Sequence, residues 1–152
     1  MNFVADFLLP VCQQGLVWGL VALGVWITFR VVNVPDLTVD GTLTTGAATA
    51  ARLLTMGVHP VPATLAGFFT GAAGGVITGL IHTRLRVQPL LASIITMTGL
   101  YSVNLRIMGR SNIALFNLTT LVPDDDWAQL ALFGVIAAAM ILLLNLFFRP
   151  EL

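Results

Sequence analysis

The chain has 152 residues, of which 57% are hydrophobic and only 9% are charged, and its mean hydropathy is +0.94. Soluble domains carry about 25% charged residues, so this composition indicates an integral membrane protein. The sequence contains no lysine, which excludes the P-loop motif G-x-x-x-x-G-K-[ST] and ATP binding of that type. The formal net charge is zero, so nothing indicates a nucleic-acid partner.

Five hydrophobic segments predict the fold. A transmembrane helix needs about 20 residues at about 1.5 Å each. We therefore expect a single all-α transmembrane domain over residues 1–152, with about five helices at approximately 7–29, 39–58, 61–81, 89–105 and 127–148. The first segment lacks a basic start, which favours a retained helix over a signal peptide.

The arginines predict the orientation of these helices. Cytoplasmic loops of membrane proteins carry an excess of Lys and Arg. More arginines fall on the cytoplasmic side when the N-terminus is outside and the C-terminus is cytoplasmic, so we expect this orientation. The cytoplasmic side then holds Arg30, Arg84, Arg86 and Arg149. The outer side holds Arg106 and Arg110, with Arg52 near the outer end of its helix.

The second helix is the most polar of the five, and its length leaves two interpretations. Only eleven residues separate Asp40 from Arg52, about 16 Å of helix against a bilayer core of about 30 Å. If the helix extends to Val58, the Arg52 side chain can reach the interface. Alternatively, the helix is discontinuous and breaks near Pro35–Gly41, as transporter helices often do around their pathway.

A line of polar residues runs along this helix with alternating spacings of four and three, which places them on one face. These residues are Thr38, Thr42, Thr45, Thr49 and Arg52. Threonine hydroxyls in membrane helices bond the carbonyl four residues earlier or tie helices together. The alternative interpretation is that the stripe lines a substrate pathway.

Carboxylates near the start of the same helix also have two interpretations. Asp36 and Asp40 are four residues apart, which could form a paired-carboxylate site or a proton relay. Asp40, however, lies about 200° around a helix from both Thr38 and Thr42, off the polar stripe. Each Asp is also well placed to cap the helix or to pair with Arg30, and this second interpretation is favoured.

The remaining sequence offers a packing motif and little chemistry. Glycines recur every fourth residue in the third segment, at Gly67, Gly71, Gly75 and Gly79. Repeated G-x-x-x-G lets helix backbones approach closely, so these glycines predict a helix-packing face. No nucleophile–base set and no Cys or second His in register with His59 or His82 is present, so we expect no catalytic residues, no metal site and no cofactor.

Two stretches of sequence resemble a known family. V-V-N-V-P-D-L-T-V-D-G-T-L-T-T-G-A-A-T-A-A at 31–51 and T-R-L-R-V-Q-P-L-L-A-S-I-I-T-M-T-G-L-Y-S-V-N-L-R-I-M-G-R-S-N-I at 83–113 are similar to permeases of ABC importers. The group is the branched-chain amino acid and sugar permease superfamily. The D-L-T-V-D-G and M-G-R-S-N segments most resemble its tryptophan/tyrosine import permeases.

This resemblance implies a function and its partners. The chain is expected to be the permease component of an ATP-binding cassette importer in the bacterial inner membrane. The substrate is expected to be an aromatic or branched-chain amino acid, or a related small solute. A separate ATPase subunit would hydrolyse ATP, an extracytoplasmic binding protein would deliver the ligand, and two permease chains would enclose the pathway.

One departure from the family bears on activity. Its members are roughly twice as long and continue into a cytoplasmic coupling loop and a second half. This chain is therefore expected to be a truncated or split product that is inactive alone. The rival hypotheses are a small oligomeric channel or secondary carrier, which needs no ATPase, and a structural membrane subunit, which conducts nothing.

Overall fold

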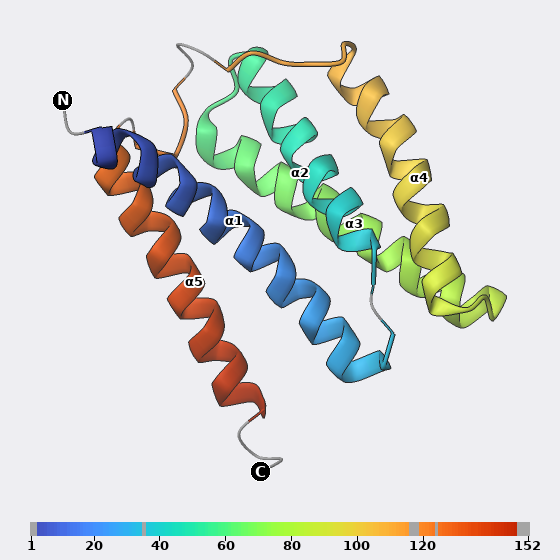
Figure 1. Cartoon of the computed structure of the whole chain (residues 1–152). Helices are drawn as coiled ribbons and strands as arrows, with labels where there is room; N and C mark the ends of the chain where they lie inside the picture. The colour runs from blue at the N-terminus through green and yellow to red at the C-terminus, as the bar shows by residue number, and fades with distance from the viewer. Residues whose placement is uncertain (1–2, 35, 116–118, 124, 149–152) are drawn as a thin grey trace. The chain divides into compact units, whose positions relative to one another are not determined.

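The computed structural model describes residues 3–34, 36–115, 119–123 and 125–148, and every regular element in this part of the chain is an α-helix. The helices are α1 (Phe3–Val32), α2 (Thr38–Thr55), α3 (Pro60–Leu85), α4 (Pro89–Met108) and α5 (Asp126–Phe148), drawn in Figure 1. The prediction of an all-α chain with about five helices is confirmed. Pro35, at one end of the segment where a break in the second helix was considered, lies outside the described residues.

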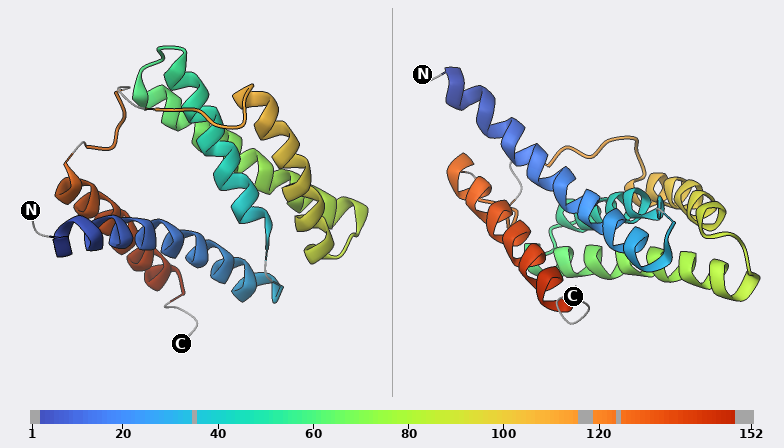
Figure 2. Two further views of the ribbon diagram at one scale, coloured as in Figure 1. Left: turned by 45° about the horizontal axis from the view of Figure 1, so that its top comes forward. Right: turned by 60° about the horizontal axis from the view of Figure 1, so that its bottom comes forward.

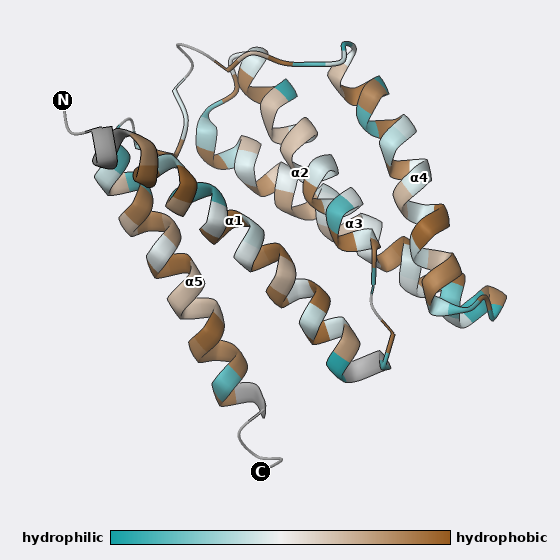
Figure 3. Cartoon of the chain, viewed as in Figure 1, coloured by the Kyte–Doolittle hydropathy of each residue, from teal (hydrophilic) through white to brown (hydrophobic). Residues whose placement is uncertain are grey.

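Four of these helices are long and apolar enough to cross a membrane. The candidate spans are Phe7–Arg30, Pro60–Leu85, Pro89–Met108 and Asp126–Leu146, judged over the described residues. The exception is α2, whose 18 residues would extend about 27 Å and include both Asp40 and Arg52. Figure 3 shows the contrast, since α5 is mainly brown whereas α2 carries pale and teal residues.

The chain divides into two compact units. One unit comprises residues 1–23 and 122–152, with most of α1 and all of α5. Within it, the Gln13 side-chain amide donates a hydrogen bond to the Asp126 backbone carbonyl at 2.9 Å. The other unit comprises residues 24–121, with the end of α1 and helices α2, α3 and α4.

In the second unit α2 makes the most extensive contacts, with both α3 and α4, and those two helices also contact each other. Both views in Figure 2 show α2 lying along α3. The backbones approach closely because small residues face each other. A Cβ atom built on Gly67 would lie only 2.6 Å from the carbonyl oxygen of Gly46. Packing of this kind drives helix association in lipid, where burying apolar surface brings no gain.

Small and polar residues fill the interior of this unit, and large apolar residues cover its outside. Ala63, Ala92 and Ser93 are fully buried, while Phe68 and Phe69 on α3 are about two-thirds exposed. In water this distribution would be costly, whereas in a bilayer it satisfies polar groups inside and presents hydrocarbon to lipid. The burial pattern therefore agrees with the membrane class that composition predicted.

The second helix is unbroken. Its hydrogen-bonded backbone runs continuously from Thr38 to Thr55, through Gly41. The discontinuous alternative is therefore wrong for this region, and the irregular backbone instead precedes the helix, where Asn33 has a φ of 58°. Gly41 serves packing, because a Cβ there would lie 3.2 Å from the Met97 Cα of α4.

Candidate functional site

The start of α2 is held by one of the two predicted capping carboxylates. Asp36 Oδ1 accepts a hydrogen bond from the backbone N–H of Thr38 at 2.8 Å, which satisfies a donor at the first helical residue. Asp40, by contrast, is the third residue of α2 and makes no capping bond in the described chain. Neither carboxylate forms an ion pair with Arg30 among the described residues.

The threonine stripe faces α3. The hydroxyls of Thr38 and Thr78 lie 2.9 Å apart in a buried hydrogen bond, and Thr70 Oγ1 donates to Thr49 Oγ1 at 3.1 Å. The hydroxyl of Thr45 donates to the Gly41 carbonyl at 2.7 Å. The hydroxyls of Thr38 and Thr49 thus tie α2 to α3, while that of Thr45 bonds its own helix. Both arrangements belong to the first of the two interpretations that the sequence allowed.

The alternative role of the stripe, a pathway lining, stays a prediction, and the five residues differ in their exposure. Thr38 and Thr45 are at most 4% exposed, and the Thr42 methyl group lies against Gly74 of α3. Arg52 is the exception, because it is exposed in the last turn of α2. A buried hydroxyl that is already hydrogen-bonded offers nothing to a passing solute.

The predicted glycine face is used only in part. Gly67 and Gly71 lie against α2, whereas Gly75 and Gly79 have no atom of another helix within 4 Å of their Cβ positions among the described residues. A spacing of four residues rotates about 40° per step around a helix, so the series turns away from α2. Gly74 contacts α2 instead, because a Cβ atom built on it would lie 2.8 Å from the Thr42 methyl carbon.

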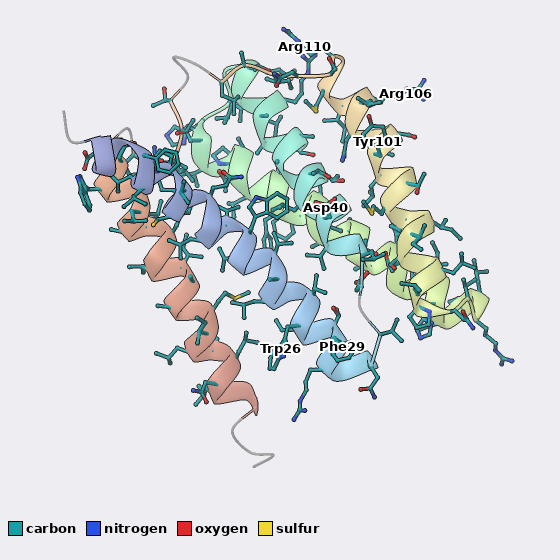
Figure 4. All side chains as sticks on the ribbon, viewed as in Figure 1. Trp26, Phe29, Asp40, Tyr101, Arg106 and Arg110 are labelled. Carbon is teal, nitrogen blue, oxygen red and sulfur yellow. The ribbon has the colours of Figure 1, made fainter. Side chains whose placement is uncertain are left out.

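The opposite face of α2, which the sequence analysis did not assign, borders a groove against α4. The groove has a volume of about 380 Å³. From α2 it is lined by Asp40, Gly41 and Thr44. From α4 and the following residues it is lined by Met97, Tyr101, Asn104, Leu105, Met108 and Ser111. Figure 4 labels Asp40 on α2 and Tyr101 on α4.

One hydrogen bond crosses the groove and leaves one atom without a partner. Asn104 Nδ2 donates to Thr44 Oγ1 at 3.1 Å. The other end of the amide, Asn104 Oδ1, is buried and has no hydrogen-bond partner in the described structure. Such groups are uncommon in native proteins and often mark a site that a ligand or water completes.

A signal for this groove was present in the sequence. Asp40 and Thr44 are four residues apart and lie on the face opposite the threonine stripe. The α4 segment is also unusually polar for a membrane helix, with Tyr101 and Asn104 three residues apart. What the sequence could not show is that these two faces meet.

The fold and this groove define a class, namely a multi-pass helical membrane protein with polar side chains between two of its helices. The described residues hold no cluster of three or more His, Cys, Asp or Glu side chains suited to a metal ion. Residues 7–149 match the model of one family, the branched-chain amino acid transport system / permease component. The chain belongs to this family, and the resemblance drawn from its motifs is confirmed.

Curated relatives agree with this membership. The chain is 42% identical, over 118 residues, to a tyrosine transport system permease protein of Clostridioides difficile (strain R20291), an overlap of 78% of this chain and 40% of that protein. It is 35% identical over 125 residues to an uncharacterized protein of Rickettsia prowazekii (strain Madrid E), covering 80% of this chain and 44% of the relative.

A more distant relative is a ribose import permease protein of Escherichia coli (strain K12), which is 30% identical over 103 residues. That overlap covers 68% of this chain and 32% of the relative. The chain thus spans less than half the length of the curated relatives it matches. No solved structure matches the chain.

Proposed function

We propose that this chain is a permease component of an ATP-binding cassette importer that carries an amino acid or a related small solute. The family match over residues 7–149 carries the proposal. The named relatives favour small polar solutes, because one is a tyrosine transport permease and another is a ribose import permease. Of these two, the tyrosine permease is the more similar, which favours an aromatic or branched-chain amino acid.

The groove between α2 and α4 is the best-supported place for solute contact. It combines a carboxylate, an amide and three hydroxyl groups with three large apolar side chains, and it lies within otherwise apolar helices. Polar groups at membrane depth are expensive and commonly mark a solute pathway. Arg52, the exposed member of the polar stripe, remains a candidate for contact at the end of α2.

The remaining parts of the proposal concern assembly. An ATPase subunit, an extracytoplasmic substrate-binding protein and a second permease chain would complete the importer in the bacterial cytoplasmic membrane. The proposed orientation has the N-terminus outside and the C-terminus cytoplasmic, which follows from the arginine distribution. The chain itself would not hydrolyse ATP, since it contains no lysine for a P-loop.

Uptake in cells tests this function. Deleting the gene is expected to abolish the ATP-dependent accumulation of one radiolabelled amino acid, and restoring the gene is expected to recover it. Collapsing the proton gradient while ATP is maintained should leave the uptake in place. Solute flux through ATP-free liposomes that contain only this chain would overturn the proposal in favour of a channel or secondary carrier.

A further inference from the structure

The hydrogen bonds around Asn104, a residue of the groove wall, determine which of its side-chain atoms is left without a partner. The Thr44 hydroxyl lies 2.9 Å from the Gly41 carbonyl and 3.0 Å from the Asp40 carbonyl, so its single proton is committed to its own helix. That hydroxyl can therefore only accept a hydrogen bond from Asn104. The acceptor role places Asn104 Nδ2 at Thr44 and leaves Oδ1 as the unpaired atom.

This unpaired oxygen is buried with the rest of its side chain. Asn104 is only 7% exposed, and no described donor lies within reach of Oδ1. A buried amide oxygen without a hydrogen-bond partner is unfavourable until a donor reaches it. The groove therefore contains an acceptor that requires a hydrogen-bond donor from outside the chain.

A second acceptor in the same groove carries a negative charge. The carboxylate of Asp40 lies one helical turn before Thr44, and no ion pair neutralises it among the described residues. No arginine is among the groove-lining residues, and Arg106 and Arg110, labelled in Figure 4, are exposed. Among the residues that line the groove, Asp40 alone is charged, which favours a cationic donor.

The rest of the groove wall is apolar. Met97, Leu105 and Met108 contribute flexible hydrophobic side chains, and Tyr101 adds an aromatic ring. Methionine side chains adapt to irregular ligands and make favourable contacts with aromatic rings. A volume of about 380 Å³ lies within the range of small-molecule sites, roughly 300 to 1,000 Å³.

We propose that this groove binds the protonated amino group of a small ligand that carries an apolar or aromatic body. The two Asp40 carboxylate oxygens and Asn104 Oδ1 supply three acceptors, which match the three N–H donors of a primary ammonium group. The body of the ligand lies against the methionines and Tyr101. The assignment rests on the proposed transport function only in treating this ligand as the solute that the permease carries.

A metal cation fits the same acceptors less well. Calcium takes six to eight oxygen ligands, and magnesium takes six in near-ideal octahedral geometry. Asp40 and Asn104 together offer three oxygen acceptors, and the Thr44 hydroxyl already accepts the Asn104 amide. The apolar wall has no role in binding a bare ion, whereas it suits the hydrocarbon body of an amine.

Equilibrium binding of simple probes to the purified full chain in detergent tests the assignment. The probe is radiolabelled phenethylamine, which is protonated at neutral pH. We expect unlabelled phenethylamine to compete, and phenethyl alcohol, which has the same body without the charge, to compete about tenfold less well or worse. Methylammonium, which lacks the body, and sodium chloride are expected to compete only weakly.

Two variants place the binding in the groove. Asp40→Asn removes the charge and is expected to weaken phenethylamine binding by about tenfold to a hundredfold. Asn104→Leu removes the unpaired oxygen and is expected to weaken binding by about twofold to tenfold. The matched control is Asp126→Asn, which removes a carboxylate from the exposed start of α5 and is expected to leave binding unchanged.

A stability measurement separates ligand binding from a structural role of Asn104. Asn104→Leu removes the unsatisfied buried acceptor and also the 3.1 Å hydrogen bond to Thr44, so the comparison is Thr44→Val, which removes that hydrogen bond and keeps Oδ1. The two variants should have similar melting temperatures without ligand, and equal losses of phenethylamine binding in both would overturn the assignment of Oδ1 as a ligand contact. The Asp40→Asn variant, whose carboxylate makes no internal hydrogen bond among the described residues, tests the site even if Asn104→Leu fails to fold.

The other outcomes are equally decisive. The proposal is overturned if phenethylamine does not bind, if the alcohol competes as well as the amine, or if sodium competes as well as phenethylamine. Loss of amine binding while ATP-dependent uptake persists refutes this site and leaves the importer function standing. Amine binding without any ATP-dependent uptake supports the site and refutes the importer.

Discussion

The contact between α2 and α3 gives the sharpest test of the fold, because it depends on two glycines that face each other. A Cβ added to Gly67 would lie 2.6 Å from the Gly46 carbonyl oxygen and 3.2 Å from the Ala50 Cβ. The reciprocal Cβ on Gly46 would lie 2.8 Å from the Gly67 carbonyl oxygen. Real Cβ atoms do not approach backbone oxygens this closely, so Gly67→Ala must move one helix away from the other.

The size of this effect follows from the displacement. Restoring an ordinary contact of at least 3.4 Å requires the helices to separate by roughly 0.8 Å at this point. The hydrogen bond from Thr70 to Thr49, 3.1 Å long, would then be stretched beyond a useful length. Overpacking costs about 1–3 kcal/mol, against a gain of up to about 1 kcal/mol in helix propensity from Gly to Ala.

We therefore expect Gly67→Ala to destabilise the protein by about 1–2 kcal/mol net. The matched control is Gly79→Ala in the same helix, where no atom of another helix lies within 4 Å of the Cβ position. That variant should leave stability unchanged or increase it slightly, through helix propensity alone. The measurement is unfolding of detergent-solubilised protein by sodium dodecyl sulfate, followed by circular dichroism. Equal effects of the two substitutions would refute the packing argument.

Three further predictions concern local structure in the same unit. A double-mutant cycle of Thr38→Val and Thr78→Val tests the buried hydrogen bond between these two hydroxyls. The coupling energy between the two substitutions should be about 0.6–1.7 kcal/mol, and a coupling energy of zero would contradict the hydrogen bond. Asp36→Ala should lower the free energy of unfolding by about 1 kcal/mol, because it removes the hydrogen bond to the Thr38 N–H. Asp36→Asn keeps an acceptor oxygen and should retain most of this stability. Equal losses in the two variants would count against capping. Arg86 ends α3 in the left-handed region with a φ of 54°, a conformation that glycine adopts without strain. Arg86→Gly should therefore raise the melting temperature. A lower melting temperature would show that the contacts of the Arg86 side chain stabilise the protein by more than the strain costs.

The polar residues of α2 show how far sequence reasoning reached. Their spacing predicted that Thr38, Thr45 and Thr49 share one face; the structure joins Thr38 and Thr49 to α3 by hydrogen bonds and buries Thr45. The same pattern did not identify the neighbour, because a threonine stripe looks alike whether it packs on a helix or lines a pathway. Asp40 was interpreted as a cap from its position alone, whereas it lines the groove against α4.

The glycine series shows a different limit. A period of four identifies close packing in general, but the helix turns about 40° with each step and the contact face follows the neighbouring helix. Gly67 and Gly71 therefore lie against α2 while Gly75 and Gly79 do not. Gly74, which the period omitted, approaches both α2 and Leu100 of α4. Only the crossing of the helices determines which glycines are used.

The sequence by itself determined the membrane class, the helical fold and the family, because composition, segment length and local motifs need no knowledge of neighbours. The tertiary structure alone decided the role of each face of α2. That helix packs α3 with its threonines and meets α4 with Asp40 and Thr44, which leaves Asn104 Oδ1 unpaired in the groove. Residues 60 positions apart, such as Thr44 and Asn104, carry no periodic signal that links them, and their contact arises only when the helices pack.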